Sequence, residues 1–97
     1  DLSSKAVRAN PENSTYLDTY AWVLFMRKDY NLAKFYMESA IKFGGGKNGT
    51  IVEHYGDILS LLGEKDKAIV QWKKALEIGD ASKLVSEKIK QGKYLDK

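Results

Sequence analysis

The same spacing of large and small residues occurs twice along this 97-residue chain, and this constrains the possible fold more than any other feature. Residues 16–44 read YLDTYAWVLFMRKDYNLAKFYMESAIKFG, and residues 51–79 read IVEHYGDILSLLGEKDKAIVQWKKALEIG. The two copies share one frame: Leu17-x2-Tyr20-Ala21-x2-Leu24 with Ala33-x3-Met37-x2-Ala40, then Val52-x2-Tyr55-Gly56-x2-Leu59 with Ala68-x3-Trp72-x2-Ala75. Such self-similarity is typical of stacked supersecondary units. The sequence therefore predicts two copies of one structural unit.

Each unit is predicted to be a pair of helices. Apolar residues recur at helical spacing along most of the chain, and no stretch shows the strict alternation of a half-buried strand. Asn13, Asp29 and Asn48 are expected N-caps, because their side chains can accept hydrogen bonds from the first amide donors of a helix. Breakers between the periodic segments place helices near residues 3–9, 14–27, 30–43, 49–62, 65–78 and 82–91. We therefore expect an all-α fold.

Small residues in the repeated frame mark positions where two helices must approach closely. Ala21 and Gly56 are expected at the contact within each helix pair, and the larger Met37 and Trp72 fill the space between helices. The alternation of large and small side chains is what dense helix packing requires.

The repeated frame resembles the tetratricopeptide repeat, a helix-turn-helix unit of about 34 residues with the pattern W-x2-L-G-x2-Y, A-x3-F, A and P. The resemblance covers about residues 6–90. It lacks the motif's Trp in both units, and Gly45 and Asp80 stand where Pro is usual. The wording DTYAWVL, EHYGD and QWKKAL is similar to the terminal repeats of bacterial multi-repeat proteins. The resemblance implies an α-solenoid of antiparallel helix pairs, a right-handed superhelix segment with a C-terminal capping helix.

The same resemblance divides the chain as a single domain over residues 1–97, cut from the C-terminal part of a longer array. Its expected parts are a remnant of a second helix at 1–10 with Ala6 in the final Ala slot, repeats at 14–47 and 49–80, a capping helix at 82–91, and a tail at 92–97. In the capping helix, Leu84, Val85 and Ile89 form the apolar stripe, and Lys83, Lys88 and Lys90 are expected on its other faces.

Resemblance to this family also implies a function as a non-catalytic protein-interaction scaffold. The first helices of successive repeats line a concave groove that receives a peptide or helix. The positions projected onto that groove are Thr15, Asp18, Trp22, Phe25 and Met26 in the first unit, and Thr50, Glu53, Asp57, Ser60 and Leu61 in the second. Among them Trp22 and Phe25 are the expected anchors, since exposed aromatic side chains bury a large area.

The charge of the groove indicates the kind of partner. Family members that grip C-terminal carboxylates use Lys, Asn and Arg at positions that here hold Asp18, Glu53, Trp22 and Asp57. An acidic and aromatic groove favours a protein or peptide ligand with basic and apolar side chains. Two alternatives remain open: Trp22 packs against a missing upstream repeat, or the chain self-associates through Leu2 and Val7 at its truncated N-terminal edge.

Composition narrows the other classes of function. There is no cysteine, so a disulfide framework or a thiolate metal site is excluded. The chain has sixteen basic and thirteen acidic residues. This excess of positive charge is too small to indicate a nucleic-acid partner. The longest apolar run, Ala21 to Met26, is far too short to span a membrane. We therefore expect no nucleic-acid partner and no membrane insertion by this segment, and the compartment stays undetermined.

Two local motifs resemble sites that carry chemistry. Gly44-Gly45-Gly46-Lys47 departs from a phosphate-binding loop, since Asn48 follows the lysine and a helix rather than a strand precedes; we expect a turn with a left-handed glycine. His54 with Glu53 and Asp57 resembles a metal or acid–base group, but it lacks a second histidine and a nucleophile. We expect an ion-paired or exposed histidine, and no cofactor, metal or catalytic residue.

Overall fold

The structure, a computed structural model, describes residues 13–95. Within this range the helices are α2 (Ser14–Met26), α3 (Tyr30–Lys42), the 3-10 helix η1 (Gly45–Lys47), α4 (Gly49–Leu61), α5 (Lys65–Ile78) and α6 (Val85–Gln91). The expectation of an all-α chain is confirmed. The expected helix at 3–9, with Ala6, Leu2 and Val7, and the last two residues of the tail lie outside the described residues.

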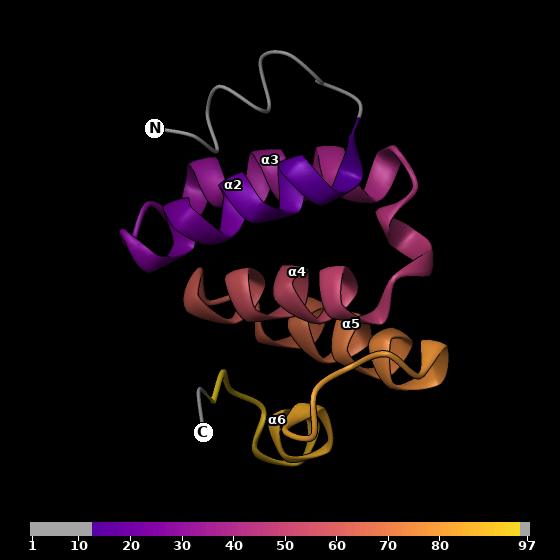
Figure 1. The fold of residues 1–97 in the computed structure, drawn as a ribbon. Helices are drawn as coiled ribbons and strands as arrows, with labels where there is room; N and C mark the ends of the chain where they lie inside the picture. The colour runs from indigo at the N-terminus through magenta and orange to yellow at the C-terminus, as the bar shows by residue number, and fades with distance from the viewer. Residues whose placement is uncertain (1–12, 96–97) are drawn as a thin grey trace.

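Sequential helices pack as antiparallel pairs, α2 with α3 and α4 with α5. Figure 1 shows the first pair stacked on the second, with α2 and α4 running in the same direction across the view. No helix in the described part of the chain is long and apolar enough to cross a membrane.

Asparagine side chains start the first helix of each pair, as the sequence predicted. Asn13 Oδ1 accepts from the amide of Tyr16 at 3.1 Å, and Asn48 Oδ1 accepts from the amides of Thr50 at 2.9 Å and Ile51 at 3.2 Å. Asp29 precedes α3, but its side chain makes no capping hydrogen bond, so that prediction was wrong.

The turn inside each helix pair explains why Asp29 differs. Its amide donates to the Leu24 carbonyl at 2.9 Å, and in the second unit the Glu64 amide donates to the Leu59 carbonyl, also at 2.9 Å. Lys28 and Gly63 have positive φ values of 66° and 83° in these turns. The backbone path set by this tight turn, rather than a side-chain cap, therefore starts α3 and α5.

Equivalent positions of the two units form the core. Ala21, Ala33, Met37 and Ala40 are fully buried in the first unit, as are Ala68, Trp72 and Ala75 in the second. A Cβ atom on Gly56 would lie 2.5 Å from the indole ring of Trp72. The larger Trp72 thus requires a glycine where the first unit, which has Met37, carries Ala21.

The glycine run joins the two pairs as a turn. Gly44 has a φ of 110°, in the left-handed region, where glycine has no steric penalty. Gly45 is buried, and a Cβ there would lie 2.6 Å from the Ala40 carbonyl oxygen. Two of the three glycines are therefore required by backbone geometry and close packing.

The C-terminal helix α6 is shorter than the expected 82–91 and starts at Val85. In Figure 1 it is seen nearly end-on, whereas the four preceding α-helices run across the view. Val85 is buried in the same cluster as Trp72, and Ile89 packs against that cluster. The apolar stripe thus anchors α6 on the second helix pair.

Candidate functional site

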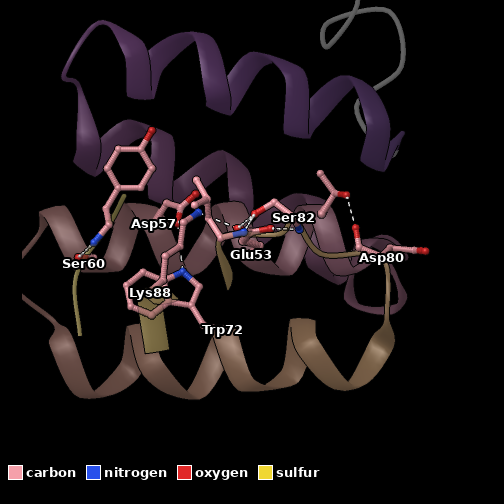
Figure 2. Close-up of polar contacts among 10 residues, drawn as sticks. Glu53, Asp57, Ser60, Trp72, Asp80, Ser82 and Lys88 are labelled. Carbon is pink, nitrogen blue, oxygen red and sulfur yellow. Dashed lines mark hydrogen bonds and ion pairs between the residues drawn. The ribbon is translucent and has the colours of Figure 1, made fainter. Parts of the chain in front are cut away.

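A buried ion cluster joins α6 to α4. Glu53 and Asp57 lie one turn apart on α4, and only 3% and 1% of their surfaces are exposed. Lys88 of α6 reaches both carboxylates: its Nζ lies 2.7 Å from Glu53 Oε2 and 2.8 Å from Asp57 Oδ1 (Figure 2). We refer to Glu53, Asp57 and Lys88 as the ion cluster.

Neighbouring groups supply further hydrogen bonds to these carboxylates. Trp72 Nε1 of α5 donates to Asp57 Oδ1 at 3.0 Å. The amide of Ser82 donates to Glu53 Oε1 at 2.7 Å, and its hydroxyl donates to Glu53 Oε2. These donors help to offset the cost of removing two carboxylates from water. The cluster therefore links α4, α5, α6 and the connection between α5 and α6 that contains Ser82.

The three groups of the ion cluster have shifted pKa values. Burial raises the pKa of Asp57 to about 6, although Lys88 and Trp72 oppose the rise. Burial acts in the same direction on Glu53, but the hydrogen bonds from Lys88 and Ser82 outweigh it and lower the pKa of Glu53. For Lys88, burial is outweighed by Asp57 and Glu53, which raise its pKa. Near neutral pH the cluster thus holds two ionised carboxylates and one ammonium.

The raised pKa of Asp57 predicts a specific pH dependence of stability. Its folded pKa of about 6 exceeds its unfolded value of 3.8, so the folded state holds a proton that the unfolded state releases. This contribution is fully present below the unfolded pKa and is lost as pH rises through the folded pKa. Between about pH 5 and about pH 7.5 we expect it to fall by about 1 kcal/mol.

Urea denaturation of the natural chain and of Asp57→Asn at both pH values would measure this loss, which should be absent in the variant. A carbon-detected NMR titration would report the Asp57 midpoint directly. Equal pH dependence of the two proteins, or a midpoint near 4, would contradict the prediction.

A second polar contact links the two helix pairs through His54. Its Nδ1 lies 2.9 Å from Asp18 Oδ1 of α2, and its ring stacks on Trp22 at a centroid distance of 4.0 Å. Glu53 and Asp57 instead contact Lys88. The imidazole of His54 therefore points away from these two carboxylates. Among residues 13–95, no group of three or more histidine, cysteine or acidic residues is arranged to hold a metal ion.

The segment after α6 continues across the same face of the molecule. The amide of Tyr94 donates to Ser60 Oγ of α4 at 3.1 Å. The Tyr94 ring meets Phe25 of α2 edge-on at 5.2 Å, and the Lys88 ammonium lies 5.2 Å from the Tyr94 ring centroid. Tyr94 thus contacts both first helices of the two pairs.

A pocket of about 280 Å³ remains between these elements. The residues that line it include Trp22, His54, Glu53, Asp57, Asp80 and Lys88. Thr50 at its edge donates a hydrogen bond to the Asp80 carbonyl at 3.0 Å. The pocket therefore combines an aromatic wall with several carboxylates.

The ten residues projected onto the groove divide by exposure. Thr15, Met26, Thr50 and Leu61 are exposed, Asp18, Trp22 and Ser60 are partly exposed, and Phe25, Glu53 and Asp57 are buried. The expected exposure of these last three needs correction, because the chain's own C-terminal part covers them. Lys88 supplies the cation for the two carboxylates, and Tyr94 packs on Phe25.

Sequence reasoning placed Lys88 on a solvated face, which was wrong, and it assigned no polar role to Trp72 or Ser82. One signal was available for Lys88. It follows Val85 by three residues and Leu84 by four, so it lies on the same helical face as the apolar stripe. A lysine within such a stripe indicates a buried partner of opposite charge.

No protein-family model matches the sequence, and no curated protein matches it significantly. Its class is therefore defined by its fold: a small all-helical domain of antiparallel helices packed in sequential pairs.

Proposed function

We propose that residues 14–47 and 49–80 are two tetratricopeptide-type units of an α-solenoid, and that the chain is a non-catalytic scaffold that binds a segment of a partner protein. The repeat assignment is supported by the two helix pairs, whose small residues are buried at identical offsets in the shared frame. It is also supported by the two intra-pair turns, which use the same backbone hydrogen bond. The binding surface is the face shared by α2 and α4.

The observation that carries the proposal is the partly exposed Trp22 at an acidic pocket. Two rings already stack on its indole, those of Phe25 at 4.4 Å and His54 at 4.0 Å between centroids, and the residue lines a space also bounded by Asp57 and Asp80. The exposed part of the indole offers apolar contact to the aliphatic stem of a lysine or arginine, whose charged end would lie beside the carboxylates. A cationic side chain is therefore the group that this pocket suits best.

The charge balance of this face supports a basic partner. Four carboxylates lie on or beside it, those of Asp18, Glu53, Asp57 and Asp80, whereas Lys88 is the ammonium that lines the pocket. Electrostatic complementarity of this kind selects partners of opposite charge. Met26 and Leu61, at equivalent positions of the two units, are 64% and 41% exposed and offer apolar contact beyond the pocket.

Binding of a defined peptide tests the proposal. A fluorescently labelled peptide of alternating leucine and lysine should bind the natural chain, and one with glutamate for lysine should not. Trp22→Ala should weaken binding roughly tenfold or more, because buried aromatic anchors carry much of the energy of an interface. Fluorescence anisotropy measures both dissociation constants.

Phe35→Ala is the matched control, because Phe35 is also an aromatic residue, is 60% exposed and lies on α3. It should leave the dissociation constant unchanged. Equal binding of the glutamate peptide, or equal loss in Phe35→Ala and Trp22→Ala, would rule out the proposed surface.

A further inference from the structure

The face proposed to bind a partner already carries a segment of this chain. Of the positions projected onto the groove, Glu53 and Asp57 contact Lys88, Ser60 accepts from the Tyr94 amide, and Phe25 contacts the Tyr94 ring. Figure 2 shows Lys88 reaching Glu53 and Asp57 of α4 from the C-terminal part of the chain. The centre of the expected groove is therefore filled, and its two ends remain exposed.

The covering segment, α6 with residues 93–95, has the chemistry expected of a ligand for this face. It inserts one lysine between two buried carboxylates, and six residues later it places an aromatic ring against Phe25. It is both basic and apolar. The segment fits this face closely, since Lys88 is only 4% exposed. Within residues 13–95, every buried polar side-chain atom has a hydrogen-bond partner.

The covering segment is also weakly held compared with the helix pairs. A helix as short as α6 has little intrinsic stability, and its apolar anchoring rests on Val85 and Ile89. A buried ion pair adds little net stability, because the cost of desolvation offsets the attraction. Terminal elements with few buried contacts are the first to open in native proteins. We therefore expect α6 to detach well before the helix pairs unfold.

We propose that α6 and residues 93–95 are an internal ligand of the α2–α4 face, and that a lysine-bearing helical segment of a partner protein displaces them. This inference rests on the proposed function, because it places the partner on the same face. It adds the recognition chemistry: a lysine for the pair Glu53 and Asp57, followed by an aromatic side chain for Phe25. Because the internal segment is tethered, it competes at high effective concentration and lowers the apparent affinity for the partner.

The test uses the full chain and a labelled synthetic peptide with the sequence of residues 82–95, SKLVSEKIKQGKYL. Tyr94→Ala removes the ring contacts with Phe25 and with the Lys88 ammonium but keeps both ion pairs of Lys88. It should therefore loosen the internal segment without leaving a buried charge unpaired. We expect faster amide exchange at residues 86–91 and tighter binding of the peptide. Both should change by the same factor, about tenfold, since the apparent affinity scales with the open fraction.

Two controls define specificity. Lys93→Ala changes an exposed neighbour of Tyr94 and should alter neither exchange nor binding. A peptide with alanine in place of Lys88 should lose binding at least tenfold to every form of the chain, because it lacks the group that meets the two carboxylates.

Faster exchange in Tyr94→Ala without tighter peptide binding would overturn the inference, as would equal binding of the lysine-free peptide. Dimers of the natural chain that exchange α6, detected by sedimentation, would also overturn it, because the occupant would then be a second copy. The proposed function is tested separately from this inference. If Trp22→Ala still weakens binding of the leucine–lysine peptide, the surface binds partners and only the internal ligand is wrong.

Discussion

Lys88→Met is expected to lower the free energy of unfolding by up to about 3–5 kcal/mol, because it removes one partner of a buried ion pair. The loss cannot exceed the free energy that holds α6 in place, since detachment of α6 returns both carboxylates to water. Methionine matches the aliphatic stem of lysine, so packing changes little. Glu53 and Asp57, both nearly inaccessible to water, would be left as two like charges without a cation. Urea denaturation at neutral pH measures the loss, which should be smaller near pH 5, where Asp57 takes up a proton.

Lys90→Met is the matched control, since Lys90 lies on the same helix and is exposed; its effect should stay within about 0.5 kcal/mol. Adding Asp57→Asn and Glu53→Gln to Lys88→Met should recover part of the loss, because no uncompensated charge then remains buried. A loss below about 1 kcal/mol in Lys88→Met would show that the ion cluster is hydrated in solution.

Trp72→Ala should cost about 3–5 kcal/mol, the range for removing a large aromatic side chain from a core. The indole is completely buried and contacts the position of Gly56 so closely that no Cβ fits there. Its removal leaves a cavity between α4 and α5 and also takes away the hydrogen bond to Asp57. Thermal or urea denaturation followed by circular dichroism measures the change.

Trp72→Phe separates the two contributions. It keeps most of the ring volume but removes the Nε1 donor, so we expect a smaller loss of about 1–3 kcal/mol from the weakened Asp57 environment. If the phenylalanine variant is as unstable as the alanine variant, the hydrogen bond rather than the packing dominates, and the cavity argument is wrong.

Local features of the fold were readable from the sequence because they depend on near neighbours. Helical periodicity predicted the helices, and the side chains of Asn13 and Asn48 accept the expected capping bonds. The small residue at Gly56 was expected at a close helix contact, and the position lies against Trp72. Asp29 was the exception, because the preceding backbone turn sets the start of α3.

The candidate site was less accessible to sequence reasoning. Projection from the repeat pattern found Trp22, Thr50, Glu53 and Asp57, which line the pocket. It missed Lys88, whose pairs with these carboxylates join residues 31 and 35 positions apart. That pairing depends on where α6 docks, which the spacing of apolar residues within α6 does not specify.

The sequence alone determined that the chain is helical, that its helices form two equivalent pairs, and where small residues must lie between them. These properties follow from interactions within a few turns of a helix. Only the tertiary structure decided that α6 covers the first helix of the second pair, because burying a charge depends on a partner brought near by folding. The lysine that looked solvated is held between two carboxylates, and the surface expected to be open to a ligand is partly filled by the chain itself.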